Sequence, residues 1–76
     1  MTAIDRATLE DHLAQAECHV IDGEQHVTRQ RELVARLEQD GDTAVASEAR
    51  ELLAQFVEMQ AMHVADRDRL RRELDA

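Results

Sequence analysis

The sequence predicts an all-α protein: an antiparallel two-helix hairpin that dimerises into a four-helix bundle. Two apolar stripes with alternating steps of three and four residues indicate two long amphipathic helices. An Asp-Gly-Asp break at residues 40–42 separates the stripes, and the chain contains no proline. We expect one domain over residues 1–76, with helices over about 8–39 and 43–74 and a turn at 40–42.

The first stripe lies between residues 9 and 37. Its members are Leu9, Leu13, Ala16, Val20, Gly23, Val27, Gln30, Val34 and Leu37. Gln30 is polar, and a polar residue at such a seam position typically fixes the register and the number of partners.

Capping residues mark the ends of the helices. Thr8, with an acidic residue three positions later, approximates a capping box for the first helix, and Thr2 offers an earlier start in the same way. Gly41 suits the left-handed residue that follows a helix end. Asp42 or Thr43 can cap the second helix. The short connection makes the helices antiparallel, so residues whose numbers sum to roughly 83 face each other.

Asp22 and Gly23 form a dipeptide that often marks a turn. The stripe nevertheless keeps its phase there, because Val20 and Val27 are seven residues apart. We therefore expect a continuous helix, at roughly 1 kcal/mol of lost propensity relative to alanine. The missing side chain leaves room for a bulky residue of the second helix. Three residues are expected opposite the gap: Phe56, Met59 and His63.

The second stripe is wider than a single seam. Its members are Ala49, Leu52, Leu53, Phe56, Met59, His63, Leu70 and Leu74. Leu33 and Val57 widen the apolar faces further, which is typical of helices with two neighbours. Burial of apolar surface stabilises a fold by about 25 cal/mol per Å², whereas ordering the chain costs roughly 1.5 kcal/mol of conformational entropy per residue. The area buried along one seam is too small to offset this cost. We expect a homodimer about a twofold axis, with docking onto another protein as the competing solution.

Composition excludes several function classes. Seventeen acidic and nine basic residues give a net charge of −8, so no nucleic-acid partner is expected. No window reaches about 18 uncharged apolar residues, so no membrane partner is expected. The chain shows no secretory signal, and a single cysteine, Cys18, cannot form an internal disulfide. Both observations favour a cytoplasmic protein.

Catalytic motifs are missing from the sequence. Ser47 is the only serine, and no histidine lies at hydrogen-bonding spacing from it. There is no glycine-rich phosphate loop and no Cys-x-x-Cys pair. We expect a structural or protein-interaction module that is not an enzyme and requires no cofactor.

Histidines provide the alternative interpretation, a metal- or small-ligand-binding bundle. His19, Asp22 and His26 are spaced three and four residues apart, and His63 could approach from the second helix. Two histidines and a carboxylate are a ligand set of iron and zinc sites. However, His12, His19 and His26 recur every seven residues, a rise of roughly 10 Å, so no two of them chelate one ion from one helix. The favoured interpretation gives these histidines a packing role.

Several short runs resemble a family of short uncharacterised bacterial proteins. The runs are AECHV (16–20), GEQHV (23–27), RQR (29–31), DT (42–43), LL (52–53) and ADRDRL (65–70), together with His63. The resemblance covers most of residues 9–74. It implies a bacterial cytoplasmic protein with a helical fold, and it implies no activity or site.

Overall fold

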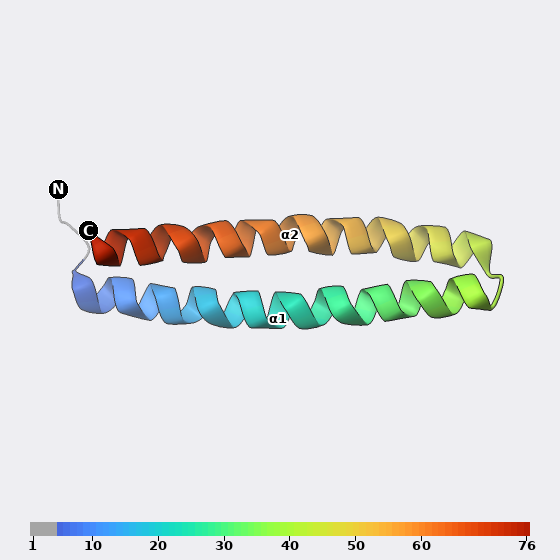
Figure 1. Ribbon diagram of the computed structural model, residues 1–76, viewed down its shortest axis with the longest axis horizontal. Coiled ribbons are helices and arrows are strands. Elements are labelled where there is room, and N and C mark those ends of the chain that lie inside the picture. The colour runs from blue at the N-terminus through green and yellow to red at the C-terminus, as the bar shows by residue number, and fades with distance from the viewer. Residues whose placement is uncertain (1–4) are drawn as a thin grey trace.

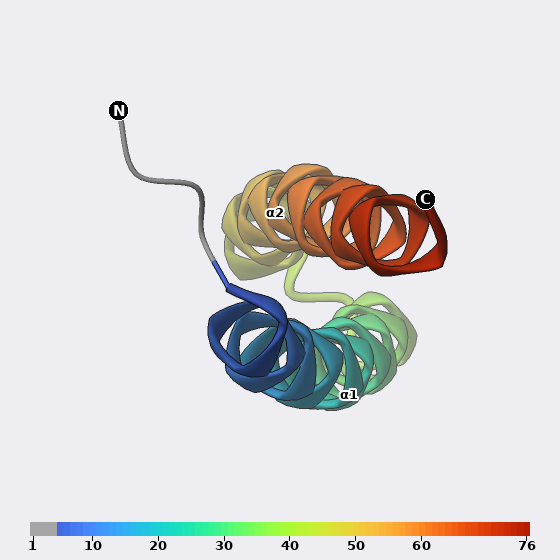
Figure 2. The same cartoon turned by 90° about the vertical axis from the view of Figure 1, so that its left-hand side faces the viewer.

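The computed structural model describes residues 5–76, and these form two helices and no strand. Helix α1 spans Arg6–Gln39 and helix α2 spans Thr43–Asp75. The helices run antiparallel and side by side, with the turn at one end of the hairpin (Figure 1). Viewed along the hairpin, α1 and α2 lie against each other as one pair (Figure 2). The predicted all-α helical hairpin is confirmed.

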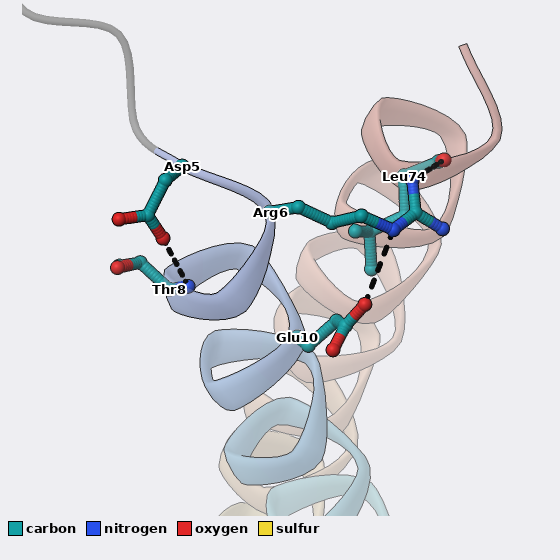
Figure 3. Close-up of polar contacts among 5 residues, drawn as sticks. All are labelled: Asp5, Arg6, Thr8, Glu10 and Leu74. Carbon is teal, nitrogen blue, oxygen red and sulfur yellow. Dashed lines mark hydrogen bonds and ion pairs between the residues drawn. The ribbon is translucent and has the colours of Figure 1, made fainter.

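Helix α1 begins two residues before the predicted start at Thr8. Asp5 is its N-cap residue, because the Asp5 carboxylate accepts a hydrogen bond of 2.8 Å from the backbone N–H of Thr8 (Figure 3). This hydrogen bond lowers the pKa of the Asp5 carboxyl. Arg6 donates through Nη1 to the carbonyl oxygen of Leu74 at 3.2 Å, which ties the first turn of α1 to the last turn of α2. Thr2, the earlier candidate cap, lies outside the described residues.

The turn follows the predicted chemistry. Gly41 has a φ of 77°, and the N–H groups of Gly41 and Asp42 donate to the carbonyls of Glu38 and Leu37. This is the Schellman arrangement, in which a left-handed glycine satisfies the last carbonyls of a helix. Asp42 then caps α2, since its carboxylate accepts from the backbone N–H of Val45 at 3.4 Å. The predicted end of α1 and start of α2 are confirmed.

The seam of α1 agrees with the first stripe. All nine predicted positions are buried or half-buried, and α1 is helical throughout, including Gly23.

The seam of α2 differs from the second stripe. Leu52 and Met59 are 41% and 53% exposed. Gln60 and Arg67 are instead half-buried, and they lie on the same face of α2 as Leu53 and Leu70. The alternating steps of three and four residues from Ala46 to Leu74 include Gln60 and Arg67. The position in this repeat therefore determines the burial of these two side chains more than their polarity does.

The residue opposite Gly23 is Gln60, and the prediction of Phe56, Met59 or His63 is wrong. An ideal Cβ at position 23 would overlap the Gln60 Oε1 atom and lie 2.7 Å from Gln60 Cδ. The Gln60 Nε2 group donates to the carbonyl oxygen of Val20 at 2.8 Å. The missing side chain of Gly23 therefore makes room for an amide that bonds to the backbone of α1.

The core between the helices is small. Its buried apolar side chains are Ala16, Val20, Val27, Val34, Ala46, Ala49, Leu70 and Leu74. Gln30 is buried with them and donates through Nε2 to the carbonyl oxygen of Ala49 at 2.9 Å. Within residues 5–76, neither helix has a stretch long and apolar enough to cross a membrane.

Candidate functional site

The seam between the helices has two flanks of different chemistry. We call one the ion-pair flank, and it comprises Glu10, Glu17, Glu24, Arg31 and Glu38 of α1 with Arg50, Val57, Val64 and Arg71 of α2. These residues repeat every seven positions beside the seam. Arg50 pairs with Glu38 at 2.7 Å, and Arg71 pairs with Glu17 at 3.4 Å. Ion pairs therefore connect the two helices toward both ends of this flank, and Val57 and Val64 line a groove between them.

We call the opposite side the histidine flank, and it comprises His12, His19, His26 and Leu33 of α1 with Val45, Leu52, Met59 and Asp66 of α2. The shared grooves fix the pairing: one is lined by His19, His26 and Met59, and another by His12 and Asp66. Leu33, Val45 and Leu52 continue these rows at spacings of seven. No ion pair crosses between the helices on this flank within residues 5–76.

Exposed apolar side chains gather on the histidine flank. Within residues 5–76 the large exposed ones are Ile21, Leu33, Val45, Leu52, Val57, Met59 and Met62. Four of these belong to the histidine flank, and Met62 lines a groove with Met59 and His63 beside it. Val57 lies on the ion-pair flank, and Ile21 lies farther out on α1. The histidine flank thus joins an apolar half near the turn to a histidine-rich half near the chain ends.

A groove of about 330 Å³ lies along the histidine flank at mid-length. Its lining includes all four residues of the predicted alternative site, His19, Asp22, His26 and His63. The His19 and His63 rings lie across the seam with centroids 5.3 Å apart and planes tilted by 43°. The His26 ring instead packs on Phe56, with centroids 5.9 Å apart.

The four predicted residues therefore divide into two subsets. His19 and His63 form a pair, whereas His26 is engaged with an aromatic ring that cannot bind a metal. Asp22 lines the groove from an exposed position on α1. As the side chains are placed, residues 5–76 contain no group of three or more His, Cys, Asp or Glu that could hold a metal ion.

Sequence reasoning did not single out the apolar row of the histidine flank. The pattern of apolar residues predicts that Leu52 and Met59 lie in the seam, and it does not include Val45. The signal that identifies them is their common heptad position: they are seven residues apart and each stands one position before a seam residue. Their exposure follows from this offset.

Comparison with known proteins yields no relative: no family model, curated protein or solved structure matches the chain. The resemblance to short bacterial proteins therefore stays a prediction.

Proposed function

We propose that the protein is a non-catalytic, protein-interaction module that forms a homodimer through the histidine flank. Two hairpins related by a twofold axis would bury this flank on each copy and complete a four-helix bundle. The observation that supports the proposal is the concentration of exposed apolar residues on one flank, in a row with seven-residue spacing. The lone Cys18, which is exposed, suits a reducing cytoplasm.

The size of the core supports the need for a partner. Ala16, Ala46 and Ala49 are three of its eight buried apolar residues, and the only other members are valines and leucines. Chains this short bury a smaller fraction of their surface on folding than larger domains do. A second hairpin adds buried area on every turn of both helices.

The difference in charge between the two flanks indicates which of them forms the dimer interface. The ion-pair flank has charged side chains at most of its positions, and removing the Arg50–Glu38 and Arg71–Glu17 pairs from water would be costly. The chain also carries a net charge of −8, so two copies repel each other wherever acidic faces meet. Leu33, Val45 and Leu52 offer a contact without these penalties.

A matched pair of variants tests the proposal. Leu52 on the histidine flank and Val57 on the ion-pair flank are 41% and 42% exposed, and both lie in the middle of α2. Leu52→Glu places a charge in the proposed interface, whereas Val57→Glu places the same charge outside it. The mass of each variant is measured by light scattering at a common protein concentration, and circular dichroism checks its helix content.

The expected result is a dimeric Val57→Glu protein and a monomeric Leu52→Glu protein that are equally helical at low temperature. A dimeric Leu52→Glu protein would contradict the proposed face. A parent chain that is itself a folded monomer would contradict self-association and would favour docking of the same flank onto a different protein.

A further inference from the structure

The His19 and His63 pair places two metal-ligating side chains next to each other. The two rings come from different helices and meet at the groove on the histidine flank. The seven-residue spacing prevents chelation only between histidines of one helix. His19 and His63 belong to different helices, and the antiparallel register brings them together across the seam.

The separation of the rings fits shared coordination of one ion. A zinc–nitrogen bond of about 2.0–2.1 Å puts each imidazole centre about 3.2 Å from the ion, and a tetrahedral angle then separates the two centres by about 5.2 Å. The observed separation of the His19 and His63 centroids is 5.3 Å. The two ring centres are thus already at a separation that shared coordination of one ion allows.

The surroundings of the pair favour a cation. Asp22 stands one helical turn after His19 and lines the same groove, so its carboxylate supplies a negative charge near the pair. The net charge of the chain is −8, which raises the local concentration of cations. Other charged groups near the pair act in opposite directions: Asp66 shares a groove with each histidine, and Arg69 pairs with Asp66 at 2.7 Å.

We propose that His19 and His63 bind a divalent transition-metal ion such as Zn²⁺, with water completing its coordination and the Asp22 carboxylate as a nearby counter-charge. Imidazole suits zinc, copper and nickel. An ion held by α1 and α2 together cross-links the helices, so it stabilises the folded chain by mass action. The site lies within one hairpin and does not depend on the proposed dimer.

His12 provides the control. It occupies the same heptad position as His19, one heptad earlier on α1, and the groove that it lines contains Asp66 and Arg69. His12 shares its groove with the Asp66–Arg69 ion pair and has no second histidine opposite it on α2. A metal bound nonspecifically by surface histidines would use His12 as readily as His19.

The experiment is a calorimetric titration of untagged protein with ZnCl₂, for the parent and the variants His12→Gln, His19→Gln and His63→Gln. The parent and His12→Gln should each bind one zinc per chain. Loss of either His19 or His63 should weaken binding at least tenfold, since even the loss of a group supporting a ligand costs about 10–100-fold. Imidazole NMR signals of His19 and His63, but not of His12, should shift when zinc is added to the parent.

Three outcomes would overturn the proposal. These are no saturable zinc binding by the parent, equal weakening in His12→Gln and His19→Gln, and zinc-induced shifts spread evenly over the four histidines. The NMR measurement uses the parent alone, so it decides the matter even if a variant fails to fold. Light scattering during a titration of Leu52→Glu, the variant expected to be monomeric, shows whether an ion bridges two chains, which would also contradict a site within one hairpin.

Discussion

Gln60 occupies the space that a side chain on Gly23 would fill, and its Nε2 group bonds to the carbonyl oxygen of Val20 at 2.8 Å. Its Oε1 atom is buried against Gly23 with no hydrogen-bond donor, the one such side-chain atom in residues 5–76. Gln30 forms the complementary contact to the carbonyl oxygen of Ala49. Each helix thus has one glutamine whose side chain donates a hydrogen bond to a backbone carbonyl of the other helix. Each glutamine lies opposite a residue with little or no side chain.

Gly23→Ala should be nearly neutral in the parent. Alanine improves helix propensity by about 0.8–1 kcal/mol. However, it displaces the Gln60 amide, whose hydrogen bond contributes about 0.5–1.5 kcal/mol. Gly23→Leu should destabilise by about 1–3 kcal/mol through overpacking. Urea unfolding at a fixed protein concentration measures these differences.

The control for this prediction is the Gln60→Ala background. There the space beside Gly23 is vacant, so Gly23→Ala should stabilise by about 0.4–1 kcal/mol. If Gly23→Ala has the same effect with and without Gln60, the two residues are not coupled and the packing explanation of the glycine is wrong.

Gly41→Ala should destabilise for a different reason. Nothing lies within 4 Å of a Cβ at Gly41, but its φ of 77° is left-handed. An alanine there costs about 1–2 kcal/mol of backbone energy. Gly41→Asn should cost less, because asparagine tolerates this conformation. Equal stability of the parent and Gly41→Ala in urea would contradict the assigned turn.

Gln30→Glu should destabilise strongly at neutral pH. The Gln30 amide is buried and donates to the Ala49 carbonyl, whereas an ionised carboxylate has no donor and would place a charge in the seam. The expected loss is about 1–3 kcal/mol or more. Burial raises the folded-state pKa of the introduced carboxyl above its unfolded value of about 4.3.

The sign of the pH dependence follows from this raised pKa. The destabilisation is complete above the folded-state pKa and decreases as the pH falls toward the unfolded value, where the protonated carboxyl can donate to the Ala49 carbonyl. Gln25→Glu, at an exposed position of α1, is the control and should show no such recovery. Urea unfolding at several pH values measures both variants, and a pH-independent loss would contradict a buried carboxyl.

Asp5 should give the opposite pH dependence. Hydrogen bonds from Thr8 lower the pKa of its carboxyl in the folded chain, so its charge stabilises the fold above the unfolded pKa of about 3.9. This contribution is lost as the pH falls through the lowered folded-state pKa. The melting temperature of the parent should therefore exceed that of Asp5→Asn at neutral pH and approach it in acid. A gap that widens in acid would refute the assigned cap.

The seam of α1 could be predicted completely because its apolar residues keep one phase from Leu9 to Leu37. The seam of α2 could not, because Gln60 and Arg67 occupy positions where hydropathy predicts an apolar residue. Gln60 is accommodated by the gap at Gly23, and Arg67 is half-buried, with a side chain that is 24% exposed. The position of Gln60 depends on the gap that α1 offers, whereas the Arg67 guanidinium pairs with Asp68 of its own helix.

The sequence predicts which residues line the candidate site, but it does not predict how they are arranged in space. His19, Asp22, His26 and His63 do line one groove. Which two of them meet depends on the register that the turn sets between α1 and α2. Predicting the pair requires that register to within one residue. Spacing along a helix fixes distances within that helix, whereas the His19–His63 contact depends on how far α2 slides along α1.

The mass of the parent chain in solution tests the central claim, dimerisation through the histidine flank, most directly. Sedimentation equilibrium at micromolar concentrations should give about twice the chain mass of 8.7 kDa. The melting temperature should rise with protein concentration, because folding and association are linked. A folded 8.7 kDa species with a concentration-independent melting temperature would contradict the claim.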